Sequence, residues 1–407
     1  MEKKLAVRSA MRDACNTCII ILILKTAAFF LPGLKCVCGD KKRRGLTSFD
    51  VEVFSNKNAF RALWCVLPDW QNLESLTLHE CQLNREWFWA ALARQTAEPY
   101  NLRKLDVTVL GDEGQGMELD SIQLTMHVNS FFSIFVSNDK PLEQLSLTFN
   151  QCEGKCFIMH CGEEPSFVCC EKFELTHHFN DEFYNKDMAT QIRLNPALKH
   201  LTLKMVDRYH ESMSTPAIRA LHDKVNPLLE TITFSDLSIT AASFNSLRCL
   251  LPKMTHLREL HLVRSLKRVG KFIACPQFIV AMRRTPTLCL LELTGNKLGA
   301  HAAALLKALV DADGERSTHL HSLRLDGNDI PMKSLSDAIL TLVRRRAGRQ
   351  EKVLDILDLG LLETCHEDKA TLAAVLDGMT SLFDSCDLDP RSCLHCLHRK
   401  FSGLFQQ

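Results

Sequence analysis

The stretch LCLLELTGNKLGAHAAALLKALV, residues 288–310, is followed by a second version of itself, LHSLRLDGNDIPMKSLSDAILTLV, residues 320–343. In both copies leucines occupy the first, fourth and sixth positions, and an asparagine, Asn296 or Asn328, occupies the ninth. Each copy then continues with apolar residues three and four apart, a spacing typical of an amphipathic helix. The chain therefore repeats one unit, a short leucine segment followed by a helix.

Weaker copies of this unit cover most of the chain, and the starts of successive copies lie mostly roughly 28–31 residues apart. Two of the copies are degenerate, and the one at Cys170 is assigned because it divides a long interval evenly. A leucine segment of this kind buries one side of a strand and exposes the residues in between. The period leaves room for a full returning helix. The further copies start at Leu46, Leu73, Leu102, Leu142, Cys170, Leu198, Leu229, Leu257 and Leu354.

With these repeats the chain resembles the leucine-rich repeat family, specifically its ribonuclease-inhibitor-like subtype. The resemblance implies an α/β fold, a leucine-rich repeat solenoid (horseshoe) with an inner parallel sheet and outer helices. We expect about ten repeats over residues 46–385, an N-terminal segment over 1–45 and a tail over 386–407. Asn296 and Asn328 are predicted to occupy equivalent turns after adjacent strands, with their side chains bonded to backbone groups.

The chain has 407 residues, 46% of them hydrophobic, and a formal net charge of +1. This charge balance gives no bulk attraction to nucleic acid or to a membrane. Several of the 18 cysteines, among them Cys81, Cys170 and Cys289, fall where a core residue is expected. Cysteine used as a small buried apolar residue indicates a reducing compartment, so we expect a cytoplasmic protein.

Denaturation without a reductant is expected to expose nearly all 18 cysteines as reactive thiols. Counting thiols with a chromogenic disulfide reagent checks this expectation. Several native disulfides would contradict the cytoplasmic assignment, because structural disulfides belong to oxidising compartments.

The segment CIIILILKTAAFFLPGL, residues 18–34, is the most apolar of the chain. In one interpretation it begins a terminal repeat that caps the solenoid, with a first strand at Ile19–Leu24. In a second it is a membrane-associated segment that leaves the repeats facing the cytoplasm, although Lys25 would cost roughly 2.5–3.5 kcal/mol within a bilayer. A cleaved signal peptide is the third interpretation, and Lys25 interrupts its apolar core as well.

Motifs for catalysis are scarce. The glycine-rich segment GDEGQG, residues 111–116, has the wrong spacing to hold a phosphate. It is interpreted as a tolerated surface loop or, alternatively, as a rim loop that touches a partner. A weak metal candidate lies near the C-terminus, where two cysteines stand three apart, but a second half-site is missing. Its residues are Cys386, Cys393, Cys396 and His398. We therefore expect a protein that is not an enzyme and has no cofactor, no metal and no small-molecule substrate.

The fifth residue of each copy defines a central column of side chains on the inner face of the sheet. This column is mildly acidic and almost free of aromatic residues, which favours a protein partner with a basic surface. Two alternatives are a GTPase activator similar to the Ran GTPase-activating proteins, and the substrate-recognition part of a ubiquitin-ligase adaptor or innate sensor. The candidate partner-binding residues are Asp50, Asp106, Glu174, His261, Glu292, Arg324 and Asp358.

Overall fold

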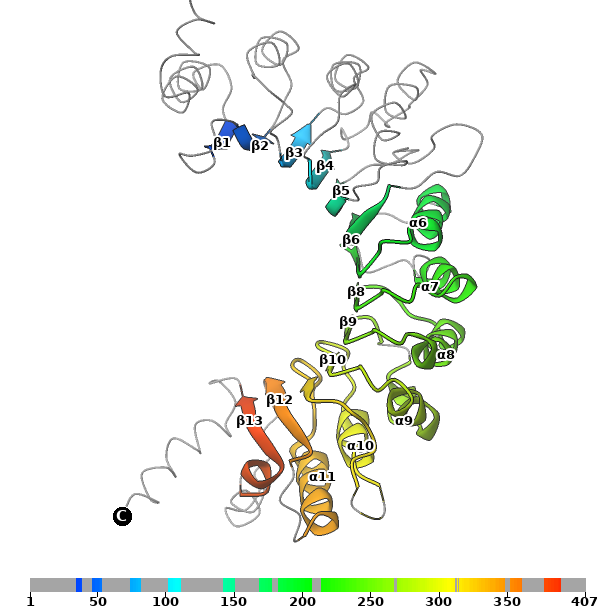
Figure 1. The fold of residues 1–407 in the computed structure, drawn as a ribbon. Coiled ribbons are helices and arrows are strands. Elements are labelled where there is room, and N and C mark those ends of the chain that lie inside the picture. Colours follow the sequence, from blue (N-terminus) through cyan, green and yellow to red (C-terminus); the bar gives the residue numbers. More distant parts are fainter. Residues whose placement is uncertain are drawn as a thin grey trace, which may run out of the picture. The chain divides into compact units, whose positions relative to one another are not determined.

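In the computed structural model the chain has an α/β leucine-rich repeat fold in which, within each compact unit, a strand lies beside the strand of the next repeat (Figure 1). It divides into two compact units, Met1–Leu198 and Lys199–Gln407. The structure describes residues 34–38, 46–52, 74–81, 102–110, 142–150, 168–177, 182–206, 214–266, 269–311, 313, 315–347, 352–360 and 377–388.

The first unit contains strands β2 to β6, which are parallel and follow chain order. The strand β1 pairs with β2 in the antiparallel direction. Helix α6 (Glu182–Leu194) follows β6. The strands are β1 (Leu34–Cys38), β2 (Leu46–Glu52), β3 (Ser75–Cys81), β4 (Lys104–Leu110), β5 (Leu142–Asn150) and β6 (Cys170–His177).

These strands confirm the two degenerate copies, because β2 begins at Leu46 and β6 begins at Cys170. The N-terminal end of the sheet differs from a simple additional repeat. The strand that pairs with β2 is antiparallel and comes from residues 34–38. The expected first strand at Ile19–Leu24 lies outside the described residues.

The second unit is a parallel sheet of seven strands in chain order. The strands are β7 (His200–Met205), β8 (Thr231–Ser235), β9 (Glu259–Val263), β10 (Leu290–Glu292), β11 (Ser322–Arg324), β12 (Leu354–Gly360) and β13 (Phe383–Leu388). Between them lie the helices α7 (Ser214–Asp223), α8 (Ala241–Leu250), α9 (Pro276–Arg283), α10 (Ala300–Ala308) and α11 (Met332–Arg345). Short 3₁₀ turns occur at Leu251–Lys253 and Gly270–Phe272.

Helices α7 to α11 cover one face of this sheet and leave the other face uncovered by any described helix (Figure 1). We call the uncovered side the open face. The leucine positions point to the helices, as in β9, where Leu260 and Leu262 are fully buried and Glu259, His261 and Val263 are partly exposed. This alternation follows from the two-residue period of a strand.

The turns after β10 and β11 are built by the ninth residue of the repeat. Asn328 is fully buried, and its amide donates to the carbonyl oxygens of Leu293 (2.8 Å) and Leu325 (2.7 Å). Its Oδ1 accepts from the backbone N–H of Asn296 at 3.0 Å. Asn296 makes the same contacts one repeat earlier, donating to Leu262 and Leu293 at 2.6 Å each. The prediction for the two asparagines is therefore confirmed.

The same turn also requires a left-handed backbone at the eighth residue of the repeat. Glycine adopts that conformation without strain, and it is present at Gly295 (φ 71°) and Gly327 (φ 63°). In the two preceding repeats the equivalent residues are Asp236 (φ 59°) and Arg264 (φ 50°), which are not glycines. Gly295 also lies against Arg264, because a Cβ there would come within 2.6 Å of the arginine Cγ.

Candidate functional site

The register of the sheet places the predicted column in line. In the first unit, Asp50, Thr77, Asp106, Ser146 and Glu174 are successive cross-strand neighbours. In the second unit the order is Thr202, Thr233, His261, Glu292, Arg324, Asp358 and Asp387. All seven residues predicted from the sequence thus lie at equivalent positions of the two sheets.

The charges of this column are partly neutralised by neighbouring side chains. In the first unit, Lys172 lies 3.2 Å from Glu174. In the second unit, Arg324 approaches the carboxylate of Glu292 at 3.7 Å, and Thr294 donates to the other oxygen of Glu292 at 3.1 Å. Glu174 and Glu292 are therefore paired with basic side chains rather than free carboxylates.

His261, in the column of the second unit, contacts two carboxylates. Its Nδ1 lies 2.6 Å from Oε2 of Glu292, and its Nε2 lies 3.2 Å from Oε2 of Glu259. The side chains of His261 and Glu292 are only 14% and 18% exposed, whereas that of Glu259 is 44% exposed. We call Glu259, His261 and Glu292 the histidine clamp.

Electrostatics within the clamp favour its charged form. Burial lowers the pKa of His261. The hydrogen bonds that the ring makes to Glu292 and Glu259, together with the negative charges of these carboxylates, outweigh burial and raise this pKa above its ordinary value. The hydrogen bond from His261 lowers the pKa of Glu292, and burial only partly offsets that effect. The structure thus favours an imidazolium between two carboxylates.

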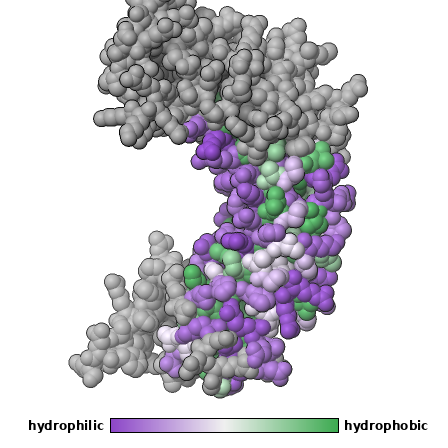
Figure 2. Space-filling model, viewed as in Figure 1, coloured by the Kyte–Doolittle hydropathy of each residue, from purple (hydrophilic) through white to green (hydrophobic). Residues whose placement is uncertain are grey.

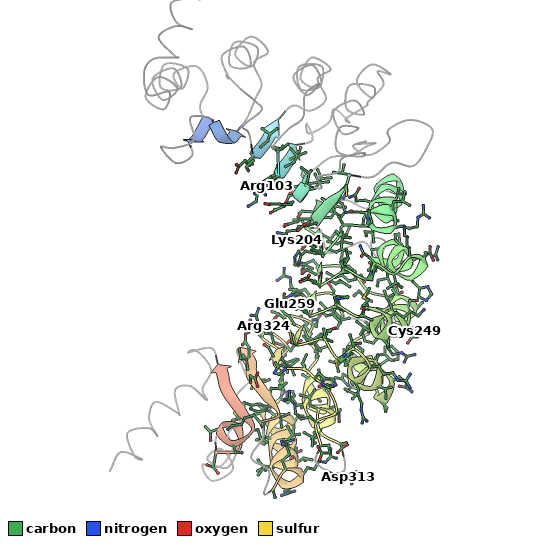
Figure 3. The ribbon with its side chains drawn as sticks, viewed as in Figure 1. Arg103, Lys204, Cys249, Glu259, Asp313 and Arg324 are labelled. Carbon is green, nitrogen blue, oxygen red and sulfur yellow. The ribbon has the colours of Figure 1, made fainter. Side chains whose placement is uncertain are left out.

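Further acidic residues surround the clamp on the open face of β9 to β12. Asp326 follows β11, and in β12 Asp355 and Asp358 are both partly exposed. Asp355 bonds to the exposed His321 at 2.8 Å. Figure 3 shows Lys204, Glu259 and Arg324 on the strand side of the repeats and Cys249 on the helix side. Arg258, which is exposed, stands before β9 at the repeat position of His321 and Asp355. Five carboxylates, two guanidiniums and two imidazoles thus share this part of the open face, which we call the acidic strip.

The acidic strip is mainly polar. At the positions of β7 to β12 that face away from the helices there is no phenylalanine, tyrosine or tryptophan. The largest exposed apolar residue there is Ile356, at 43% exposure. Figure 2 shows a mainly hydrophilic coloured surface on which apolar residues form separate spots. Such a surface is suited to hydrogen bonds and charge pairs rather than to burial of a large apolar patch.

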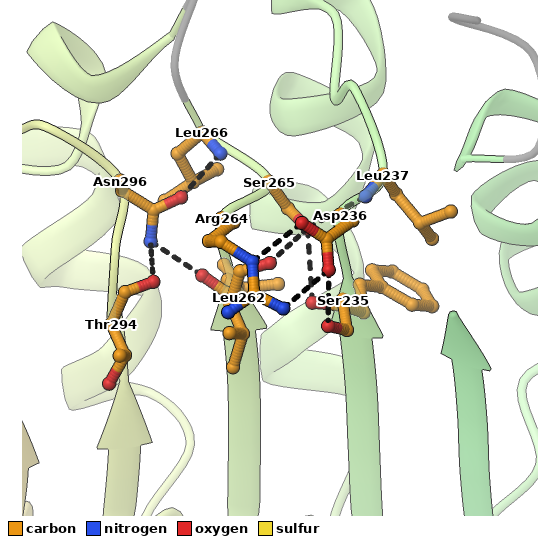
Figure 4. Close-up of polar contacts among 11 residues, drawn as sticks. Ser235, Asp236, Leu237, Leu262, Arg264, Ser265, Leu266, Thr294 and Asn296 are labelled. Carbon is orange, nitrogen blue, oxygen red and sulfur yellow. Dashed lines mark hydrogen bonds and ion pairs between the residues drawn. The ribbon is translucent and has the colours of Figure 1, made fainter. Parts of the chain in front are cut away.

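A second polar network lies at the ends of β8 and β9 (Figure 4). Arg264 donates to both oxygens of Asp236, with two contacts of 2.6 Å. Ser265 occupies the ninth position of its repeat, which Asn296 and Asn328 occupy in the next two repeats and which we call the asparagine ladder. It donates to the carbonyl of Phe234 at 3.0 Å and accepts from the N–H of Leu237 at 3.1 Å. The carboxylate of Asp236 is only 8% exposed, so this network joins successive turns instead of presenting a binding group.

The cysteines with described side chains are free thiols: Cys169, Cys170, Cys249, Cys275 and Cys289. Burial raises the pKa of Cys170 to about 12, so its thiol is unreactive at neutral pH. Cys170 belongs to the core as predicted, whereas Cys289 is half-exposed and donates to the carbonyl of Arg258 at 3.3 Å. The expected core position of Cys289 is therefore wrong, because the second residue of a repeat points away from the buried leucines.

In the part of the chain that the structure describes, no group of three His, Cys, Asp or Glu side chains is placed to hold a metal ion. Of the weak metal candidates, Cys386 lies in β13 opposite Leu357. The other three, Cys393, Cys396 and His398, lie outside the described residues, as does the GDEGQG segment at 111–116.

Among the described helices, none is both long and apolar enough to span a bilayer. The apolar segment before β1, residues 18–33, is also outside the described residues.

Comparison with models of known protein families finds no match, and comparison with curated protein sequences finds none either.

Proposed function

We propose that this chain is a non-enzymatic leucine-rich repeat protein of the ribonuclease-inhibitor-like subtype. Strand and helix alternate in the second unit, and the repeat spacing of roughly 28–31 residues is typical of that subtype. A catalytic site would need a nucleophile, base or metal ligand set held at reacting distance. The described open face instead carries carboxylates, hydroxyls and basic groups that hydrogen-bond to one another.

The acidic strip is the surface that we propose for binding a partner protein with basic side chains. The observation that carries this proposal is the excess of carboxylates over cations on an uncovered face, with Glu259, Asp326 and Asp358 all partly exposed. Charge complementarity of this kind accelerates association and selects the partner. Because aromatic anchors are absent from the described strip, we expect moderate affinity with a strong electrostatic share.

A charge-reversed variant, Asp326→Lys with Asp358→Lys, is expected to weaken partner binding at least tenfold, which corresponds to about 1.4 kcal/mol. Full-length bait of the wild type and of the variant is used to capture proteins from a lysate of the source organism, and the Kd of each captured protein is then measured. Binding is also expected to weaken as the ionic strength rises past about 0.15 M, where the screening length is about 8 Å.

A matched control, Asp223→Lys with Asp337→Lys, makes the same change of charge on exposed positions of α7 and α11. It should retain the partner. Equal loss in both variants would show that only net charge matters, and equal retention would show that the acidic strip is not the binding surface. The pair Asp106→Lys and Glu174→Lys tests the column of the first unit in the same way. Denaturation midpoints should shift little in all variants, since surface changes usually alter stability by under about 0.5 kcal/mol.

A further inference from the structure

Both ring nitrogens of His261 contact a carboxylate, and this geometry specifies the protonation state. A carboxylate only accepts hydrogen bonds, and a neutral imidazole carries a single N–H. Both contacts, 2.6 Å to Glu292 and 3.2 Å to Glu259, are therefore hydrogen bonds only when the ring is doubly protonated. Loss of one proton must break one of them.

Among the described residues, the charged neighbours of His261 come from three strands. Glu259 is on the same strand, β9, and Glu292 is on β10. Arg324 on β11 reaches the clamp only through Glu292. On the other side, the neighbour on β8 is Thr233, which carries no charge. With an imidazolium the four ionised groups sum to zero, and with a neutral ring they sum to one negative charge.

The two contacts differ in length and in the exposure of the carboxylate. This difference indicates which contact is lost on deprotonation. Glu292 is largely buried, lies closer to the ring and also bonds to Thr294. Glu259 is the more exposed carboxylate and has the longer contact. Nδ1–H therefore stays with Glu292 in the neutral ring, while Nε2 no longer donates to Glu259.

We infer that His261 is a pH switch for the open face: its protonated form holds Glu259 and neutralises the clamp, and its deprotonation releases Glu259 as a free carboxylate toward the partner. Binding of a basic partner then strengthens as the pH rises through the titration of His261. Because the two carboxylates raise the pKa of this histidine, the transition lies above the ordinary titration range of histidine. This inference rests on the proposed function, because it assigns a condition to the same binding surface.

A labelled nona-arginine peptide serves as the probe, with the full chain titrated at about pH 6 and about pH 8.5 at constant ionic strength. The wild type is expected to bind about three- to fivefold more tightly at the higher pH, the effect of one added charge at close range in water. His261→Gln should show a clearly smaller difference in affinity between the two pH values than the wild type, and His321→Gln should keep the contribution of His261. The control His301→Gln, at an exposed position of α10, should keep the pH dependence of the wild type.

A second readout needs no partner. NMR of the labelled histidine rings, with His261 assigned by its absence in His261→Gln, should give a pKa above about 6.5 that falls in Glu259→Gln. An ordinary or lowered pKa overturns the inference. Peptide binding that does not change with pH overturns the inference but leaves the proposed function standing, whereas absence of peptide binding at both pH values overturns both.

The pH dependence of thermal unfolding tests whether the pKa of His261 is raised or lowered by folding. A histidine whose pKa is raised in the folded state adds stability that is complete below its unfolded pKa of about 6.5 and is lost as the pH rises through the folded value. The wild type should therefore exceed His261→Gln in Tm at about pH 6, and the difference should shrink by about pH 8.5. A difference that grows with pH would contradict the charged clamp.

Discussion

Replacement of Asn328 by alanine is expected to lower the free energy of unfolding by about 3–4 kcal/mol. The side chain is fully buried and satisfies backbone groups of two successive repeats, including the N–H of Asn296 and the carbonyls of Leu293 and Leu325. Alanine cannot form these hydrogen bonds, so the buried backbone groups are left unpaired. Each such group costs about 1–3 kcal/mol.

Urea denaturation followed by circular dichroism measures this loss, and hydrogen exchange locates it. Protection should fall most at Asn296 and Leu298, whose N–H groups bond to the Asn328 oxygen. Asn328→Asp keeps an acceptor but loses the donor, so it should resemble the alanine variant at neutral pH. Asn245→Ala, at an exposed position of α8, is the control and should change stability by under about 0.5 kcal/mol. Equal midpoints for Asn328→Ala and Asn245→Ala would show that the ladder contributes little.

The asparagine ladder was predictable because its chemical requirement is local. A chain that leaves a buried strand must pair its backbone groups, and asparagine offers a donor and an acceptor on one short side chain. The same requirement is met by Ser265, which the leucine and asparagine pattern does not reveal. A hydroxyl can also donate and accept, so residue chemistry at the ninth position is a better guide than residue identity.

The repeat that begins with β13 was missed for a similar reason. Phe383, Cys386 and Leu388 occupy the first, fourth and sixth positions of a further copy, in register with β12. Two of the three differ from leucine, so the pattern alone is too weak, and only the interval after Leu354 signals the repeat. The antiparallel β1 carries no repeat signal at all, because its pairing depends on the direction of the chain and not on its composition.

The candidate site, too, could be predicted only in part from the sequence. The central column could be predicted from the sequence because register fixes which residues are neighbours across strands. The histidine clamp could not, since Glu259 belongs to a different column and meets His261 through the choice of side-chain conformation. The pair of Asp236 and Arg264 did have a sequence signal: both replace the glycine that Gly295 and Gly327 provide in the next repeats.

Phe278→Ala is expected to destabilise the second unit by about 3–5 kcal/mol, the usual cost of removing a buried phenylalanine. Phe278 on α9 is fully buried, and its ring centroid lies 5.2 Å from that of Phe244 on α8, with the planes tilted by 41°. Phe244 in turn lies 6.4 Å from the ring of Phe272. Phe244 thus contacts both other rings, and truncating Phe278, at one end of the set, leaves a cavity beside Phe244 that closely packed neighbours cannot close.

Val280→Ala on the same helix is the matched control, because Val280 is 45% exposed and its loss should cost little. Phe278→Leu should fall between the two, since leucine fills part of the cavity. Because α9 leads directly into β10, which carries Glu292, loosened packing should also reduce hydrogen-exchange protection of β9 and β10. If Phe278→Ala unfolds at the same urea concentration as Val280→Ala, the helices would not be packed as described. If it is less stable while β9 and β10 keep full protection, the helix layer would be independent of the sheet that presents the histidine clamp.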